Sequence, residues 1–174
     1  MRQKGFTLIE VLVAMAVGGI LMAGVVLGIF QVSWGSLRSN DQVVALTDVN
    51  YAALWLKKDL QMAHTTGMTL GGSVVLSPEN TVTLGWADFT SSFEPPEADK
   101  THFSIYSLTD SGELWRTYDD GTPRCVGRYI TYLRFTREEE MVVNVVITAT
   151  GPGVSQRNET LEFGVHMRSW GLLE

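Results

Sequence analysis

One acidic side chain, Glu10, lies directly before an apolar run of twenty residues, Val11 to Phe30. The run contains no charged side chain and no strongly hydrogen-bonding one. A carboxylate at the edge of such a run is costly unless it is paired, and the run offers no partner. The positive end of a helix dipole would offset part of this cost if Glu10 lay in the first helical turn. We therefore expect Glu10 to be a functional residue with an external partner; snorkelling into the headgroups is the alternative.

The other residue types that carry chemistry form no catalytic or metal-binding pattern. The three histidines, His64, His102 and His166, are scattered and lack carboxylates at metal-ligand spacing. The sequence has no serine in a nucleophile elbow and no Gly-rich phosphate-binding loop. We therefore expect a non-enzymatic protein without a cofactor.

An acidic loop is the main sequence candidate for binding a cation. Its carboxylates belong to Asp88, Glu94, Glu97 and Asp99. Calcium uses oxygen ligands of this kind, but their spacing matches no defined calcium loop. Asp119 and Asp120 are better explained as turn residues. The favoured interpretation is a solvated loop, with a calcium site as the alternative.

The apolar run is long enough to cross a hydrocarbon core of roughly 30 Å as a helix. Arg2 and Lys4 precede it closely, and no basic residue follows until Arg38. The positive-inside rule therefore places the N-terminus in the cytoplasm and the rest of the chain outside. We expect a single-pass membrane segment followed by an exported domain.

The residues around Glu10 resemble a known leader. The sequence KGFTLIE at residues 4–10, followed by the apolar run, is similar to the class III leader of type IV pilins and type II secretion pseudopilins. The resemblance implies that a prepilin peptidase cuts between Gly5 and Phe6, and that Phe6 is then N-methylated. It also implies that Glu10 meets the N-terminal amine of a neighbouring subunit during assembly, which supplies the missing partner.

The N-terminal segment has two alternative interpretations. An ordinary secretory signal peptide would be cut near Ala14-Met15-Ala16, which has a small-x-small pattern. Cleavage there would leave a second apolar stretch, Val17 to Phe30, at the new N-terminus, so the context argues against it. An uncleaved membrane anchor is the better alternative to the prepilin leader.

Length, charge and cysteine content narrow the class of protein further. The 174 residues suit one exported domain with its anchor, and their formal net charge is −6. Removal of Arg2 and Lys4 with the leader would leave 11 basic and 19 acidic side chains, a net charge of −8. This acidic balance does not fit a nucleic-acid partner.

The single cysteine, Cys125, excludes an internal disulfide and is expected to be buried or half-buried. Many major pilins close a C-terminal loop with a disulfide, so the resemblance favours a minor subunit or pseudopilin.

Helical spacing continues beyond the apolar run. The predicted apolar stripe consists of Leu46, Val49, Ala53, Leu56, Leu60 and Ala63. The polar residues predicted to lie off it are Arg38, Asn40, Asp41, Asp48, Lys57 and Asp59. We predict one continuous helix from about Phe6 to about His64, ended at Thr65-Thr66-Gly67 with Gly67 in the left-handed conformation.

The remainder of the chain is β-prone. Two hairpins are predicted, one from Met68–Leu76 with Thr81–Ala87 and one from His102–Leu108 with Glu113–Tyr118. Gly71-Gly72 is expected to mark a bulge in the first hairpin. Three further strands follow, at Tyr129–Thr136, Val142–Thr150 and Leu161–Arg168. The fold class is α+β, a long helix packed on an antiparallel β-sheet domain. The predicted parts are a leader at 1–5, a transmembrane or filament-core helix at 6–33, an amphipathic half at 34–66 and the β domain at 67–174.

Tryptophans are the candidates for contacts with other subunits. Trp86, Trp115 and Trp170 could serve in this way, although core burial explains each equally well. Trp34, just after the apolar run, fits an anchor at the membrane interface.

The pattern of the whole chain is similar to the J-type minor pseudopilin of type II secretion and to the W-type minor pilin of type IV pili. The resemblance implies a structural subunit of a pilus-like filament, acting in a complex at the tip that primes assembly. Its partners would be the prepilin peptidase, other minor subunits, the major subunit and, before assembly, the bacterial inner membrane. The sequence does not choose between the two systems. A permanently anchored exported binding module that never enters a filament is the alternative function.

Overall fold

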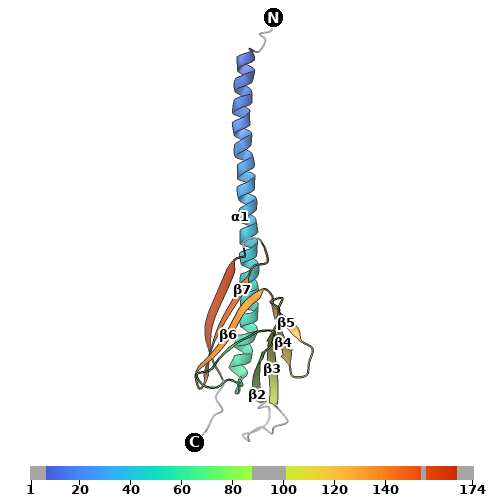
Figure 1. Ribbon diagram of the computed structural model, residues 1–174, viewed down its shortest axis with the longest axis vertical. Helices are drawn as coiled ribbons and strands as arrows, with labels where there is room; N and C mark the ends of the chain where they lie inside the picture. The colour runs from blue at the N-terminus through green and yellow to red at the C-terminus, as the bar shows by residue number, and fades with distance from the viewer. Residues whose placement is uncertain (1–6, 88–100, 154–155, 168–174) are drawn as a thin grey trace. The chain divides into compact units, whose positions relative to one another are not determined.

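A computed structural model describes residues 7–87, 101–153 and 156–167, and Figure 1 shows its helix and strands. The chain forms two compact units, residues 1–40 and 41–174. One helix, α1 (Leu8–Met62), runs through 55 residues and contains the boundary between the units. The predicted long N-terminal helix is therefore confirmed.

The described part of the first unit is the beginning of α1. Every residue from Thr7 to Asn40 is exposed, including all the leucines, isoleucines and valines of the apolar run. Within the described residues, α1 is long and apolar enough to cross a membrane, and its most apolar 18-residue segment has no buried residue. A helix that is apolar all round needs lipid or other protein to cover it.

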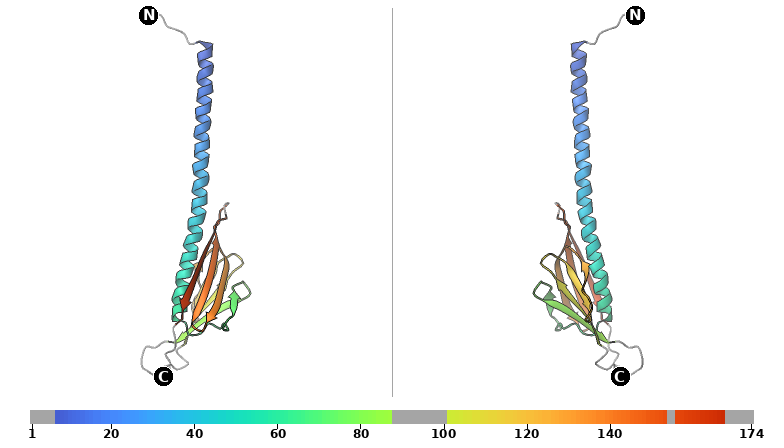
Figure 2. Two further views of the ribbon diagram at one scale, coloured as in Figure 1. Left: turned by 90° about the vertical axis from the view of Figure 1, so that its left-hand side faces the viewer. Right: turned by 90° about the vertical axis from the view of Figure 1, so that its right-hand side faces the viewer.

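The second unit contains the rest of α1 and two antiparallel four-stranded sheets. The described strands are β1 (Ser73–Val75), β2 (Thr81–Ala87), β3 (Thr101–Leu108), β4 (Leu114–Tyr118), β5 (Arg124–Gly127), β6 (Ile130–Glu139), β7 (Val142–Thr150) and β8 (Asn158–His166). Their order is β1-β6-β7-β8 in one sheet and β2-β3-β4-β5 in the other. The strands lie alongside the second half of α1 (Figures 1 and 2). The α+β class is confirmed, with two sheets in the β domain.

The first predicted hairpin is wrong, because its two strands belong to different sheets. β1 pairs with β6, placing Val74 opposite Phe135, whereas β2 pairs with β3. A turn does form between β1 and β2, where the Asn80 side chain accepts from the Ser77 N–H at 2.8 Å and donates to the Val75 carbonyl at 2.9 Å. The turn carries the chain from one sheet to the other. The turn depends on neighbouring residues and can be predicted from them. The pairing partner of β1 lies more than fifty residues further along the chain, so neighbouring residues do not indicate it.

Gly71-Gly72 also differs from its prediction. Gly71 has a φ of +73°, and the Gly72 N–H donates to the Thr69 carbonyl at 2.9 Å. These contacts form a turn before β1, so the pair does not mark a bulge within a hairpin.

The remaining strand predictions agree with the structure. β3 and β4 form the second predicted hairpin, around a turn in which Gly112 has a φ of +76°. β6, β7 and β8 occupy the last three predicted strands, although β6 continues through Glu139, beyond its predicted end at Thr136. The four-residue strand β5 was not predicted, because it is short and directly follows Pro123.

The core lies between α1 and the apolar faces of both sheets. The buried apolar residues of α1 are Ala45, Val49, Ala52, Ala53, Leu56 and Leu60, and Ala63, directly after the helix, is buried as well. On β7, the alternating residues Val143, Val145, Ile147 and Ala149 are all buried. One member of the predicted stripe is wrong, since Leu46 is 46% exposed and the neighbouring Ala45 takes its place. Asp41 and Asp59, predicted to lie off the stripe, are buried as well.

At the end of α1, backbone hydrogen bonds to β2 replace those within the helix. The Ala63 N–H still donates to the Asp59 carbonyl at 2.9 Å, but the next N–H, from His64, donates to Gly85 at 2.8 Å. Gly85 in turn donates to the Thr65 carbonyl. Gly67 does adopt the predicted left-handed conformation, with a φ of +63°, yet it lies after the helix has ended.

A close approach between the β7–β8 loop and α1 generates a stability prediction. A Cβ on Gly151 would lie 2.6 Å from the carbonyl oxygen of Asp41, a backbone atom that cannot swing away. We expect Gly151→Ala to lower the free energy of unfolding by about 1–3 kcal/mol, measured by urea unfolding of the full chain in detergent. Gly35→Ala is the matched control, because nothing lies within 4 Å of a Cβ there. Equal stability of the two variants would contradict the close approach.

Candidate functional site

The predicted processing residues lie at the start of the chain. Gly5 and Phe6 fall outside the described residues, which begin at Thr7. α1 begins at Leu8, two residues after Phe6. Cleavage between Gly5 and Phe6 and methylation of Phe6 therefore stay predictions from the sequence.

Glu10 lies in the first turn of α1, as expected of an acidic residue that benefits from the helix dipole. Its backbone N–H donates to the Thr7 carbonyl at 3.1 Å, and its side chain is exposed among exposed Leu8, Ile9 and Val11. Within the described residues, no side chain forms an ion pair with its carboxylate. An unpaired carboxylate on an apolar surface is suited to receive a cation from outside, such as an amine.

Glycines make the apolar part of α1 adaptable to close neighbours. Gly18, Gly19, Gly24 and Gly28 have no atom within 4 Å of where a Cβ would lie. No contact with the described part of the chain therefore requires a glycine at these positions. Small residues in an apolar helix allow another helix to approach closely.

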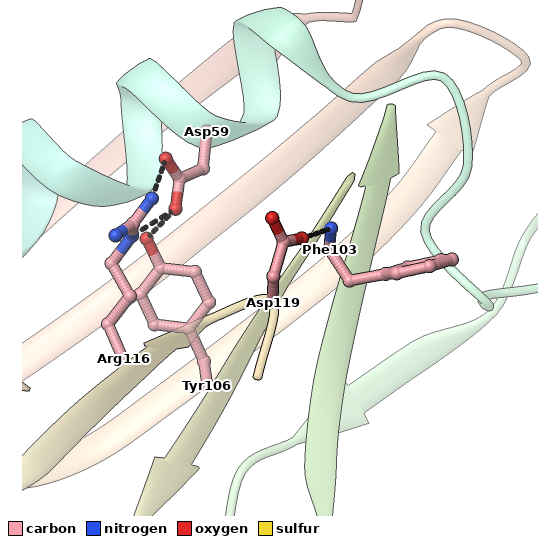
Figure 3. Close-up of polar contacts among 5 residues, drawn as sticks. All are labelled: Asp59, Phe103, Tyr106, Arg116 and Asp119. Carbon is pink, nitrogen blue, oxygen red and sulfur yellow. Dashed lines mark hydrogen bonds and ion pairs between the residues drawn. The ribbon is translucent and has the colours of Figure 1, made fainter. Parts of the chain in front are cut away.

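A second cluster of ionisable residues, missed by the sequence analysis, is buried between α1 and the sheet β2-β3-β4-β5. Asp59 on α1 has 0% exposure and faces Arg116 of β4 and Tyr106 of β3 (Figure 3). Arg116 donates from Nε to Oδ2 of Asp59 at 2.6 Å and from Nη2 to Oδ1 at 3.0 Å. The Tyr106 hydroxyl donates to the same Oδ2 at 2.6 Å. Both carboxylate oxygens are therefore engaged.

The electrostatics of this cluster hold it in one protonation state. Burial raises the pKa of the Tyr106 hydroxyl, and the neighbouring Asp59 carboxylate raises it further. Burial acts to lower the pKa of Arg116, but its hydrogen bonds and ion pair with Asp59 outweigh this effect and raise it. The Arg116 guanidinium also lies 4.9 Å from the centre of the Trp55 ring, within cation–π range. Tyrosine and arginine therefore remain protonated donors, and the arrangement is that of a structural clamp.

A signal for Asp59 was present in the helical spacing. Asp59 follows Leu56 by three residues and precedes Ala63 by four, so it belongs to the buried side of α1. Its charge led to its prediction as a solvent-facing residue. Its partners are 57 and 47 residues away in the chain, and no local pattern identified them.

The histidines do not come together. His102 on β3 pairs through Nδ1 with Asp119 Oδ2 at 2.8 Å, and Asp119 also accepts from the Phe103 N–H at 2.7 Å (Figure 3). Partial desolvation acts to raise the pKa of Asp119, but these two hydrogen bonds outweigh it and lower that pKa. Among the residues that the structure describes, no three histidine, cysteine or acidic side chains group as metal ligands. The acidic loop residues from Asp88 to Asp99 lie outside that part.

The cysteine and the described candidate tryptophans lie at half-buried or exposed positions. Cys125 is half-buried, as expected, and its thiol donates to the Gly127 carbonyl at 3.3 Å. Trp86 and Trp115 are half-buried, and Trp34 is exposed. Trp170 lies outside the described residues.

The comparisons with known proteins concern the N-terminal site. Residues 1–26 match the family model for the prokaryotic N-terminal methylation motif. No curated protein and no solved structure matches the chain. The matched segment contains Gly5, Phe6 and Glu10 together with most of the apolar run. The predicted prepilin motif is therefore confirmed.

The buried clamp predicts a large loss of stability when one charge is removed. Asp59→Ala would leave Arg116 and Tyr106 without their shared acceptor, so we expect a loss of about 3–5 kcal/mol in the free energy of unfolding. Denaturation of the full chain in detergent, followed by tryptophan fluorescence, measures this change. The double variant Asp59→Leu with Arg116→Met is the control, because it removes both charges and should regain most of the loss. A loss below about 1 kcal/mol for Asp59→Ala, on the order of a surface pair, would show that the clamp is not needed.

Proposed function

We propose that this chain, which carries a type IV pilin-like prepilin motif at residues 1–26, is a minor pilin or pseudopilin. In this role it is a structural subunit of a pilus-like filament. The match of the N-terminal segment to the methylation motif carries the proposal. The long exposed apolar helix and the β domain built around its second half support it.

Processing and topology follow from the same segment. A prepilin peptidase would cut between Gly5 and Phe6, and Phe6 would become N-methylated. Before assembly, the apolar run would span the bacterial inner membrane with the N-terminus in the cytoplasm, as the positions of Arg2 and Lys4 favour. The β domain would lie outside the cytoplasm.

Assembly would replace lipid around α1 with the helices of other subunits. Each Glu10 would pair with the N-terminal amine of a neighbour, so that neither charge remains unpaired in apolar surroundings. Helices that are out of register would leave the carboxylate unpaired in apolar surroundings. The ion pair would thus set the axial position of each incoming subunit.

The role within the filament is that of a minor subunit in a tip complex that primes assembly. The lack of an internal disulfide, with a single cysteine in the chain, favours a minor over a major subunit. Its partners would be other minor subunits and the major subunit, either of a type II secretion pseudopilus or of a type IV pilus. The role is structural, needs no cofactor and involves no nucleic acid.

The mass of the purified protein tests the proposed processing. We expect a chain that begins at Phe6 and carries one N-terminal methyl group, measured by intact mass and by sequencing of the N-terminal peptide. A strain without prepilin peptidase is the control and should yield the uncleaved chain. An intact Met1 in functional protein would instead support a permanently anchored binding module.

Glu10→Val tests the pairing in assembly. We expect cleavage and membrane insertion to continue, because the substitution extends the apolar run, while incorporation into filaments falls by at least about tenfold. Glu10→Asp, which keeps a carboxylate, is the control and should retain part of the incorporation. Sheared filament fractions, quantified by immunoblot, measure the effect. Normal incorporation of Glu10→Val would rule out the proposed ion pair.

A further inference from the structure

A groove of about 670 Å³ lies where the β1–β2, β3–β4, β5–β6 and β7–β8 connections come together. Two of these connections, β1–β2 and β5–β6, pass from one sheet to the other. A volume of this size suits a small organic ligand, and loops on a rigid scaffold often carry binding residues. We call it the loop groove, and the exposed residues that line it include Asp110, Ser111, Tyr129, Thr131 and Gln156.

Tyr129 has a strained backbone conformation in the loop groove. Its φ is +56°, and its side chain is 38% exposed. A left-handed backbone costs a bulky residue free energy that glycine would avoid. Among the described residues, three other than glycine have a positive φ, and a second of these, Gln156, also lines the groove. Outliers of this kind persist at ligand sites, which indicates that the Tyr129 ring serves a purpose other than stability.

Backbone hydrogen bonds hold Tyr129 from two directions. Its carbonyl accepts from the Thr150 N–H at 2.8 Å, and the following N–H, from Ile130, donates to the Gly112 carbonyl at 2.9 Å. These bonds join the β5–β6 connection to the end of β7 and to the β3–β4 turn. The loop groove is therefore formed before any ligand binds, which lowers the entropic cost of binding.

The charge of the lining excludes two classes of ligand. Among the described residues that line the loop groove, Asp110 is the one charged residue, and none is a lysine, arginine or histidine. Phosphates and other anions need basic side chains or a helix N-terminus, which this lining lacks. A purely apolar ligand does not fit either, because it would cover the carboxylate and hydroxyl groups without replacing their hydrogen bonds to water.

The hydrogen bonds of the lining leave it rich in acceptors. Thr150 donates from Oγ1 to Oδ1 of Asn158 at 2.8 Å. Thr131 Oγ1 lies 3.1 Å from Thr150 Oγ1, and Thr131 is the donor of this pair because the Thr150 proton is already used. Thr131 therefore keeps only its capacity to accept, and the ionised carboxylate of Asp110 is also an acceptor. A ligand that fits these groups brings several O–H donors.

We propose that the loop groove binds a neutral oligosaccharide. A sugar ring has an apolar C–H face, which would pack on the exposed Tyr129 ring. The hydroxyl groups at the edge of the sugar would donate to Asp110 and Thr131, and the Gln156 amide would both donate and accept. This activity goes beyond the proposed structural role and does not depend on it.

Titration of neutral trisaccharides into the full chain tests the proposal. The probes are maltotriose, cellotriose, mannotriose and tri-N-acetylchitotriose, and the detergent is a polyoxyethylene ether, which contains no sugar. We expect at least one probe to bind, measured by saturation-transfer NMR and by calorimetry up to about 10 mM, where a site with a Kd of about 1 mM is about 90% filled. The affinity should not fall at high salt, because the ligand carries no charge.

Tyr129→Gly separates a binding role from a structural one. It removes the ring and relieves the left-handed strain, so we expect the affinity to fall at least about tenfold while the midpoint of urea unfolding does not fall. Tyr129→Phe keeps the ring and should retain most of the affinity. Tyr51→Ala is the control, because it removes a 49% exposed ring from α1, outside the groove, and should leave the affinity unchanged. Asp110→Ala, in an exposed turn, should weaken binding at least about fivefold.

The opposite results would overturn the proposal. One is the failure of all four trisaccharides to bind, and another is an affinity that falls as salt is added. Equal affinities of Tyr129→Gly and the unaltered chain would also contradict it. A loss of stability in Tyr129→Gly, together with unchanged affinity in Asp110→Ala, would show that Tyr129 has a structural role. Filament incorporation is measured separately, so a failure of sugar binding leaves the proposed filament role intact.

Discussion

The ion pair between Asp59 and Arg116 is the contact on which the arrangement of the second unit depends. A fully buried carboxylate must be paired and hydrogen-bonded, and this one receives donors from β3 and β4 together. Its three hydrogen bonds join α1 to β3 and β4 at one point and so oppose sliding or rotation of α1 against the sheet β2-β3-β4-β5. Apolar packing alone tolerates sliding more readily, so the pair adds a directional constraint to the core.

Arg116 connects this constraint to the surrounding aromatic side chains. Its guanidinium lies 4.9 Å from the Trp55 ring centre and 5.4 Å from that of Tyr118. Trp55 belongs to α1 and Tyr118 to β4, so one side chain contacts both sides of the interface. A planar, permanently charged group can pair with a carboxylate and stack on aromatic faces at the same time, which lysine could not reproduce.

α1 changes its surroundings along its length. Before Asp41 every described side chain is exposed, and the surface is predominantly apolar with Glu10 in its first turn. After Asp41 one side is buried by the two sheets, and the opposite side stays apolar or neutral as far as Leu54. The β domain packs on the side of α1 that carries the buried residues Ala45 and Leu56.

The sequence by itself determined the features whose physical cause is local. Neighbouring residues determine the prepilin motif, the apolar run and the continuity of the helix. They also determine the alternation of Val143, Val145 and Ile147. Glu10 was identified as a candidate because its charge conflicts with its immediate surroundings. The tertiary structure decided what depends on distant partners: the burial of Asp59 by Arg116, and the pairing of β1 with β6. Short segments such as β1 and β5 carry too little periodicity to choose a partner, and a charged residue is buried only where another element supplies its counter-charge.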